Sequence, residues 1–464
     1  MLYTKWIILG IAFLMYTLIV IFPEKKSWTA LGAALLAIAA RAAGGAGEAG
    51  GGLPAFGAQA GANAVANAGA NALALFREAG GELINWDVLL IFIGSLVIAE
   101  LFIYSRAPAV IADSIVDAAP NVGIAMVLIL IMTGIISAFV ENVATVLVMA
   151  PIALALCAKL KLNPMYFMTG LAVMANLEGT ATLVGDPPSM IFADFTAKEY
   201  PPGYGFNEFF FHEGKPSICF SVQIGLLVGA LFFYLIFAKN GAQKAVIEKE
   251  KLLSIVPSIL LILMIVGLAA LSFLYGGISH ASGALVMGLG ALGILWYRFV
   301  RKETTAKTLK IIKELDWDTV FFLVGIFVVV GAVSKVGLLD DFAALLSRVI
   351  GDNVILGFVL ITLVSVLISG FVDNVPYIMV MLPVSAGLVS RMGLHPELYM
   401  FALLIGSCLG GNLTPFGASA NIVTVGILRK QGVKMTFFQW LKIGLPFTLL
   451  TTAAAALFTW FVWK

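Results

Sequence analysis

The sequence is poor in charged residues and in cysteine. Only 12% of its 464 residues are charged, whereas 61% are hydrophobic, and the mean hydropathy is +1.03. A soluble core cannot hide so much apolar surface, so we expect most of the chain to lie in lipid. The three cysteines, Cys157, Cys219 and Cys408, stand singly in apolar stretches, which argues against a disulfide framework and against a zinc site.

Other absences narrow the class of protein. A net charge of +2 is too small to suggest a nucleic acid partner. No nucleophile stands beside a base, and no metal-binding cluster is visible, so we do not expect an enzyme. A channel would more naturally be a ring of identical subunits than the single duplicated chain described below.

Long apolar runs are abundant. Helical runs that can cross about 30 Å of hydrocarbon fall at 6–22, 27–41, 86–104, 217–238, 252–275, 281–298, 317–335 and 441–462. Pro23, Glu24, Lys25 and Lys26 follow the first run in place of a cleavage site, which predicts a retained membrane helix. We expect Lys25 and Lys26 to lie in a cytoplasmic turn.

Four further apolar segments are interrupted by polar or helix-breaking residues, at 122–157, 164–195, 353–390 and 396–427. In the first, Ser137, Glu141 and Asn142 separate two arms of about 22 Å, each too short to cross a membrane alone. We therefore predict re-entrant hairpins at 122–157 and 353–390, with their polar tips at mid-membrane. Clusters of Gly, Thr and Pro in the other two segments predict crossing helices that are unwound in the middle.

An internal repeat relates these segments. Residues 134–151 align without gaps with 366–383, and half of the aligned positions are identical. The same offset pairs residues of the unwound segments: Gly179 with Gly411, Thr182 with Thr414, and Gly185 with Gly417. Each half then has an odd number of crossings, so the second half must be inverted. The predicted fold is an all-α polytopic membrane protein of two inverted repeats, with about ten transmembrane helices plus two re-entrant hairpins.

The domain organisation follows from this repeat. Residues 1–238 form the first repeat, which includes a Gly/Ala-rich external loop at 42–80. Residues 239–251 form a cytoplasmic linker, and residues 252–464 form the second repeat. Lysine and arginine are more numerous in the segments predicted to be cytoplasmic, as the positive-inside rule requires. We expect a multi-pass protein of the inner (plasma) membrane of the cell.

The two hairpin tips carry the predicted binding chemistry. A helix that begins after Asn142 or Asn374 exposes unpaired amide groups, which attract anions. The hydroxyls of Ser137 and Ser369, with the amide oxygens of these asparagines, offer hard ligands to a small cation. Sodium is therefore expected at Ser137, Asn142, Ser369 and Asn374.

Four acids fall in the same zone: Glu141, Glu178, Asp186 and Asp373. The four interrupted segments contain no Lys, Arg or His well inside them, so each acid must be protonated, hydrogen bonded at a helix end, or facing a cation. Asp186 precedes two prolines and fits a simple helix cap equally well. Glu141 and Asp373 occupy equivalent repeat positions, which favours proton or cation coupling.

The motifs SAFVENVATVLVMAP, EGTATLVGDPPSMI, SGFVDNVPYIMVMLP and GGNLTPFGASANI resemble the ion transporter superfamily over about residues 80–464. That superfamily includes arsenite permeases, the P protein, citrate-transporter-like proteins, sodium/proton antiporters and divalent anion sodium symporters. The resemblance implies a scaffold, a transport domain that moves as an elevator, and a homodimer. It also places sodium sites at the four tip residues and at the unwound loops, here Gly179, Thr180, Thr182, Gly411, Asn412 and Thr414.

Two departures from the superfamily affect the expected substrate. Glu141 and Asp373 stand where the symporters have a serine, which puts a dicarboxylate site of that kind in doubt, and Glu178 replaces a usual glycine. The leading hypothesis is a secondary active transporter that couples a small anion or organic acid, such as citrate or a dicarboxylate, to a sodium or proton gradient. Sodium/proton antiport and arsenite efflux are the alternatives. No cofactor is expected beyond the coupling ion, and the expected partners are the substrate and membrane lipid.

Overall fold

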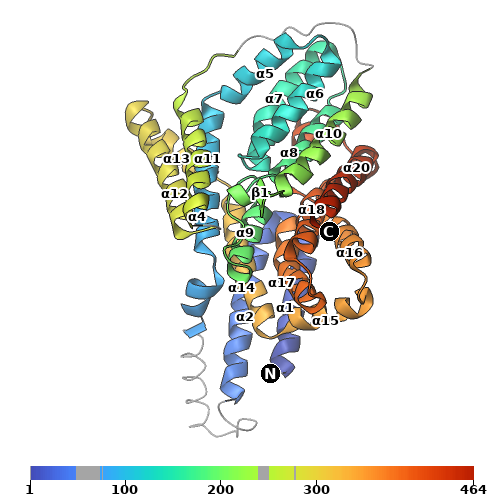
Figure 1. Cartoon of the computed structure of the whole chain (residues 1–464). Helices are drawn as coiled ribbons and strands as arrows, with labels where there is room; N and C mark the ends of the chain where they lie inside the picture. The colour runs from blue at the N-terminus through green and yellow to red at the C-terminus, as the bar shows by residue number, and fades with distance from the viewer. Residues whose placement is uncertain (1, 49–73, 76, 239–249, 276–277) are drawn as a thin grey trace.

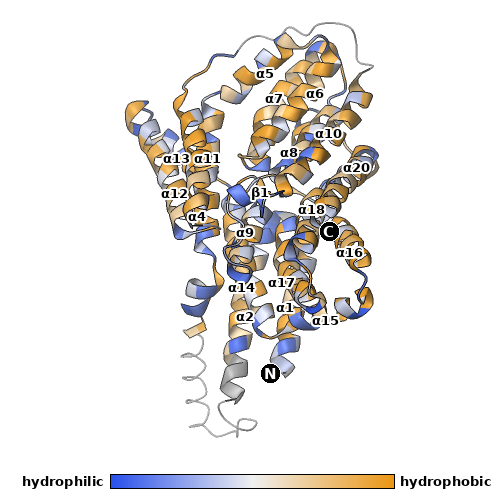
Figure 2. Ribbon diagram, in the orientation of Figure 1, coloured by the Kyte–Doolittle hydropathy of each residue, from blue (hydrophilic) through white to orange (hydrophobic). Residues whose placement is uncertain are grey.

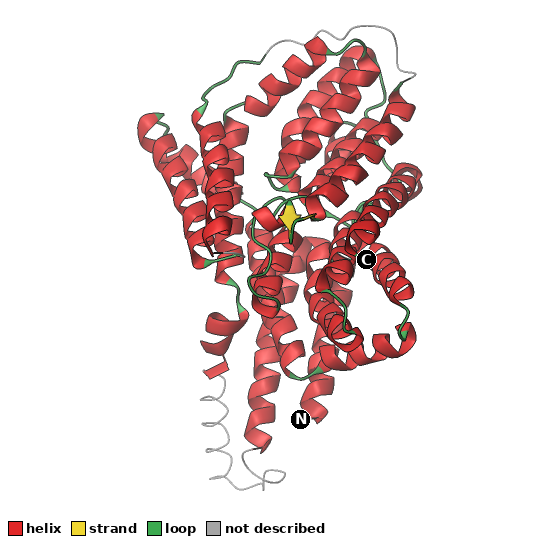
Figure 3. Ribbon diagram, viewed as in Figure 1, coloured by secondary structure: helices red, strands yellow, loops and turns green. Residues whose placement is uncertain are grey.

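The computed structural model describes residues 2–48, 74–75, 77–238, 250–275 and 278–464. Most of the predicted external loop and residues 239–249 of the predicted linker lie outside these ranges. The described chain is almost entirely helical (Figures 1 and 3). Its short antiparallel strands pair Phe211 with Pro216 and His212 with Lys215.

The elements of the first half are α1 (Leu2–Ile21), η1 (Pro23–Lys25), α2 (Lys26–Glu48), η2 (Ala79–Leu83), α4 (Trp86–Tyr104), α5 (Ala107–Ala118), α6 (Val122–Ser137), α7 (Asn142–Leu160), α8 (Met165–Gly179), α9 (Pro187–Glu199), η3 (Asn207–Phe209), β1 (Phe211–His212), β2 (Lys215–Pro216) and α10 (Ile218–Phe237). The elements of the second half are α11 (Val256–Tyr275), α12 (His280–Leu295), η4 (Trp296–Val300), α13 (Thr305–Glu314), α14 (Trp317–Lys335), α15 (Leu338–Ile350), α16 (Val354–Ser369), α17 (Asn374–Met392), α18 (Pro396–Gly410), α19 (Ser419–Lys430) and α20 (Phe437–Trp463).

The helices have the length and the apolar surface expected of membrane-spanning helices. Within the described residues, nine helices are long and apolar enough to cross a membrane: α1, α4, α7, α10, α11, α12 with η4, α14, α17 and α20. Large apolar side chains point outward, including Phe273 (84% exposed) and Phe461 (80% exposed), and hydrophobic residues make up most of the helical ribbon (Figure 2). Such a surface is unfavourable in water and suits hydrocarbon. The chain is an integral, multi-pass membrane protein.

Three predicted boundaries are wrong. The second arms of the hairpins, α7 and α17, contain 19 residues each and are about 28 Å long rather than about 22 Å. Each continues through an internal proline, Pro151 in α7 and Pro383 in α17. Residues 42–48 extend α2 instead of opening the predicted loop.

The two halves use the same local devices. The side chain of Asn121 caps α6 by accepting a hydrogen bond from the Ile124 amide at 2.9 Å, and Asn353 caps α16 in the same way from Leu356 at 3.0 Å. In the unwound segments, the Thr182 hydroxyl donates to the carbonyl of Ala138, and the Thr414 hydroxyl donates to that of Gly370. The sequence repeat is therefore a structural repeat, with each unwound segment tied to the hairpin tip of its own half.

The helices form two groups. In the first, called the scaffold group, α2 packs along α14 and α4 along α12, with α1 and α11 beside them. The second, called the hairpin group, contains the hairpins α6–α7 and α16–α17 with α8, α9, α10, α18, α19 and α20. The hairpins reach the centre of the molecule from opposite ends (Figure 1). Each hairpin also packs on the broken helix of the other half, α7 on α19 and α17 on α9.

Candidate functional site

A small cavity of about 30 Å³ lies where the hairpin tips meet. It is lined by Lys26, Glu141, Asn142, Asn176, Asp186, Pro187, Thr319, Asp373, Asn374, Val375, Ala418, Ser419 and Ala420. Four helices of the hairpin group begin at this cavity: α7, α9, α17 and α19. Because a helix N-terminus has unpaired amide groups and a partial positive charge, this arrangement can receive negative charge.

Carboxylates occupy three of these helix starts. Glu141 caps α7, accepting from the Ala144 amide at 2.9 Å, and Asp373 caps α17, accepting from the Val375 amide at 3.1 Å. Asp186 stands at the capping position of α9, but its side chain makes no capping hydrogen bond. The simple cap that the sequence also allowed for Asp186 is thus absent.

Asp186 instead joins the two hairpin tips. Its Oδ2 accepts a hydrogen bond from Asn374 Nδ2 at 3.0 Å, and it is also hydrogen bonded to Asn142. Asn142 in turn accepts a hydrogen bond from the Ser137 hydroxyl at 2.7 Å. A β-carbon at Gly179 would collide with Asn142 Oδ1, so glycine is required there for this close approach.

Lys26 changes the electrostatics of the site. Its Nζ lies 3.3 Å from Asp373 Oδ2 and 3.3 Å from Ser419 Oγ, and the residue is only 9% exposed. The interrupted segments supply no basic partner, as expected, but α2 begins at the cavity and places Lys26, from outside those segments, against the second hairpin tip. Of the states expected for the central acids, Asp373 both caps a helix and faces a cation.

The scaffold group contributes further polar residues beside Lys26. The Ser27 hydroxyl donates to Asp318, at the start of α14. Asp316 caps α14 and accepts hydrogen bonds from the amide of Thr319 at 3.0 Å and from its hydroxyl at 2.6 Å. The starts of α2 and α14 therefore form the scaffold side of the cavity.

The predicted site residues divide into two sets. Five line the cavity: Glu141, Asn142, Asp186, Asp373 and Asn374. The others lie behind it or in the unwound segments: Ser137, Glu178, Gly179, Thr180, Thr182, Ser369, Gly411, Asn412 and Thr414.

Glu178 and Ser369 differ most from their expected roles. Glu178 is 1% exposed, faces Gly134, and accepts a hydrogen bond from Gln223 at 2.6 Å. Ser369 donates its hydroxyl hydrogen to the carbonyl of Ser407. Neither residue lines the cavity.

Sequence reasoning missed Asn176. Its Nδ2 donates to Asn412 Oδ1 and to Asn421 Oδ1, both at 2.9 Å, and its Oδ1 is buried without a partner. An unsatisfied acceptor at a cavity wall is available to a ligand. Nothing in the apolar run around Asn176 signals this role, because its partners come from the other half of the chain.

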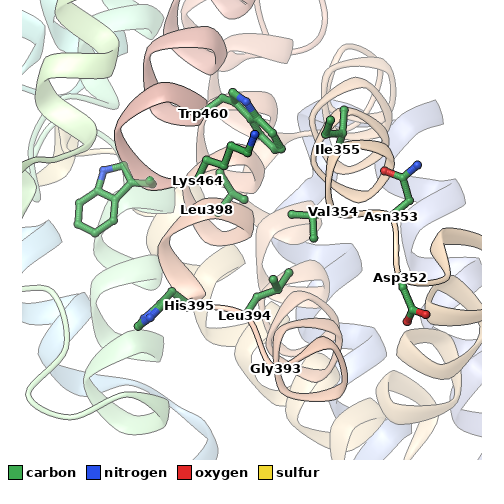
Figure 4. A pocket seen from close by; sticks show the side chains of 11 residues that line it. Asp352, Asn353, Val354, Ile355, Gly393, Leu394, His395, Leu398, Trp460 and Lys464 are labelled. Carbon is green, nitrogen blue, oxygen red and sulfur yellow. The ribbon is translucent and has the colours of Figure 1, made fainter.

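Other polar clusters lie away from this cavity. A larger cavity of about 760 Å³ opens between the start of α16 and the end of α20, with Asp352, His395, Trp460 and Lys464 around it (Figure 4). Elsewhere, His212, Glu213 and Glu397 offer ligand atoms within 4.8 Å of one another, a spacing that a metal ion could bridge. No predicted site residue belongs to either place.

The architecture and the site define a class of protein. Inverted halves whose broken helices meet at one polar cavity are characteristic of secondary transporters. The family model described as "Citrate transporter" matches residues 16–406 and also 312–464. The chain belongs to this citrate transporter family, which confirms its resemblance to the ion transporter superfamily.

Related proteins agree with this assignment. An uncharacterised transporter of Mycobacterium tuberculosis is 31% identical over 390 residues, covering 82% of this chain and 87% of its own length. The human P protein is 25% identical over 401 residues, covering 70% of this chain and 47% of the P protein.

Solved structures share the fold. The YdaH transporter of Alcanivorax borkumensis superposes with a TM-score of 0.58 at 16% identity, covering 84% of this chain and 88% of YdaH. MtrF of Neisseria gonorrhoeae, described as illuminating a class of antimetabolite efflux pumps, gives a TM-score of 0.54 at 16% identity over 92% of this chain and 94% of MtrF.

Proposed function

We propose that this protein is a secondary active transporter that couples the movement of a small organic acid, of the citrate or dicarboxylate kind, to a sodium or proton gradient. The observation that carries the proposal is that four helix N-termini and three carboxylates share one cavity. The amides and the helix dipoles suit a carboxylate substrate. The acidic side chains can bind a cation. A bound cation would also offset the repulsion between these acids and an anionic substrate beside them.

The first-half tip is one place for the coupling ion. The hydroxyl of Ser137 and the amide oxygen of Asn142 lie 2.7 Å apart at the end of α6. These are hard oxygen ligands of the kind that small cations prefer. Ser369 and Asn374 occupy the corresponding positions in the second half.

Movement of the hairpin group past the scaffold group supplies the proposed transport step. The cavity lies on the boundary between the two, because Lys26 and Thr319 come from the scaffold group and the remaining lining residues from the hairpin group. A displacement of one group would carry the site toward the opposite side of the membrane. We place the protein in the inner membrane of the cell, as a homodimer formed through the scaffold group.

Sodium/proton antiport is the second candidate. Glu141 and Asp186 form no ion pair with any basic side chain in the described part of the chain, so they are free to exchange a proton for a cation. Arsenite efflux has no specific observation in its favour.

Reconstitution into liposomes tests these assignments. Symport predicts that an imposed inward sodium or proton gradient drives uptake of radiolabelled citrate or succinate above the level without a gradient. Antiport predicts a change of lumenal pH on addition of sodium when no organic acid is present. Gradient-independent uptake, or none of either acid, would refute coupled organic acid transport.

A further inference from the structure

The ammonium group of Lys26 occupies a position that suits a transported cation. It lies between a carboxylate oxygen of Asp373 and the hydroxyl of Ser419, at 3.3 Å from each. Both groups offer oxygen, as a sodium site requires. The phenyl ring of Phe322, 5.2 Å away, faces the ammonium group from the scaffold side, and the acids Asp316 and Asp318 lie near enough to act on its charge.

The internal repeat shows that this arrangement is not a general feature of the fold. Asp87 of α4 is the repeat partner of Asp318 of α14, and it pairs with His280 of α12 at 2.8 Å, whereas Asp318 accepts a hydrogen bond from Ser27 of α2. Gly94 of α4 packs on Val286 and Met287 as Gly325 of α14 packs on Ala30 and Leu31, so Ser282 stands in α12 where α2 has Lys26. The repeat partner of Ser419 is Pro187, which has no hydroxyl. Within the described part of the chain, therefore, only the second hairpin tip has a lysine paired with its carboxylate.

We propose that Lys26 holds the place of the coupling cation at Asp373 and Ser419, so that binding of the cation requires Lys26 to leave. This rests on the proposed function, because it gives the second hairpin tip a coupling cation of that transport cycle, in addition to the site proposed at the first tip. Lys26 belongs to the scaffold group and Asp373 to the hairpin group. Their ion pair ties the two groups together while no cation is bound, and displacement of Lys26 frees the hairpin group to move.

Competition of this kind has a measurable consequence. A charge that competes for a site weakens the apparent affinity of the ion, so removing Lys26 strengthens it. For Lys26→Gln we expect the half-saturating sodium concentration to fall about tenfold, or the midpoint of a proton response to move up by about one pH unit. Lys26→Arg keeps the charge and is expected to leave the response within about twofold of the wild type.

The experiment is thermal denaturation of the purified full-length protein in detergent. In the first series, the sodium chloride concentration is varied while choline chloride keeps the ionic strength constant. In the second series, the pH is varied. Lys25→Gln, at the exposed neighbouring position, is the matched control and should behave as wild type. In an Asp373→Asn background, adding Lys26→Gln should cause no further shift, because the group for which Lys26 competes is gone.

The outcomes separate the two proposals. A wild-type protein that responds to sodium or pH, with a Lys26→Gln variant that responds at the same concentration, would overturn the role of Lys26 and leave the transport proposal standing. A wild type that responds to neither ion would overturn cation coupling and the role of Lys26 together. A shift that persists in the Asp373→Asn background would place the effect elsewhere than at Asp373.

Discussion

The two hairpin tips have the same backbone and different electrostatics. In the first half, the carboxylate of Glu141 is held by the backbone amide of Ala144 and forms no ion pair within the described residues. In the second half, Asp373 caps its helix and is also paired with Lys26. Duplication supplies two equivalent helix breaks, and substitutions on the neighbouring scaffold then make them unequal. We infer that the first tip is the freer of the two to bind or release an ion.

Loss of either tip asparagine should have the largest effect, because these side chains hold the two tips together. Asn374→Ala removes a donor to Asp186, and Asn142→Ala removes the acceptor for Ser137 and a second partner of Asp186. Leaving a buried polar group without its hydrogen-bond partner costs about 1–3 kcal/mol, so we expect coupled uptake to fall by about 100-fold. Gradient-driven uptake of labelled citrate into proteoliposomes measures this.

The asparagine variants need a matched control. Asn163→Ala removes a side-chain oxygen that accepts a hydrogen bond from the Met165 amide at 3.0 Å, at the start of α8 and away from the cavity, and it should retain uptake. All three variants should reach the membrane in equal amount. Normal uptake with unchanged sodium dependence in Asn142→Ala or Asn374→Ala would remove that residue from the site.

A comparison of two equivalent glycines sharpens the contrast between the halves. In Gly179→Ala the added methyl group would collide with Asn142 Oδ1, whereas at Gly411 the nearest atom is the Gly417 carbonyl oxygen at 3.1 Å. Overpacking costs about 1–3 kcal/mol, so we expect Gly179→Ala to lower uptake more than about tenfold and Gly411→Ala less than about threefold. Gly288→Ala, with no atom within 4 Å, is the control. Equal losses at Gly179 and Gly411 would contradict the asymmetry of the tips.

Local patterns predicted much of this structure. The identical stretches around the tips and the repeated Gly and Thr residues indicated two hairpins and two unwound helices. A polar break in an apolar run allows few other structures, because backbone polar groups in lipid must be hydrogen bonded within the protein. The lengths of α7 and α17 were not predicted, since both helices continue through an internal proline.

The scaffold side of the site was not predictable in the same way. Lys26 contacts Asp373, which is 347 residues away in the sequence, and Asn176 contacts Asn412 and Asn421 in the other half of the chain. Contacts between distant segments leave no local periodicity in the sequence. The acid at each tip was expected to be protonated, hydrogen bonded at a helix end or facing a cation, and nothing in the sequence showed that Lys26 would face Asp373.

Neutralising Glu141 should change the pH dependence of transport more than neutralising Asp186 does. Asp186 is hydrogen bonded to two side-chain amides, whereas Glu141 is held by backbone amides alone and is freer to exchange a proton. In the wild type, one limb of the plot of uptake rate against pH is expected to change by about tenfold per pH unit, and Glu141→Gln should lose that limb. Asp186→Asn should lower the rate and keep the shape of the profile. Uptake measured across acidic and alkaline pH distinguishes them, and a profile reshaped only by Asp186→Asn would reverse the assignment.

The smallest effect is expected at a peripheral ion pair that resembles the central one. Glu78 is bonded to Lys335 and lies 3.3 Å from Arg41, so it ties the end of α14 to α2. Burial raises the pKa of Glu78, but the hydrogen bond from Lys335 and the charge of Arg41 outweigh it, and the pKa lies below its ordinary value. The pair therefore stabilises the folded protein above the unfolded pKa of Glu78, and this stabilisation is lost as the pH falls through the folded pKa.

Glu78→Gln should accordingly lower the free energy of unfolding by about 0.5 kcal/mol at neutral pH, since partly exposed ion pairs contribute little. The difference from wild type should vanish in acid, and Glu24→Gln, at an exposed position, should show no difference at any pH. Asp373→Asn should be more destabilising at neutral pH, by about 2 kcal/mol, because it leaves Lys26 buried without its partner. Thermal melts of the four proteins against pH compare the two pairs directly. A Glu78 effect as large as that of Asp373 would mean that burial at the central cavity adds nothing to the strength of its ion pair.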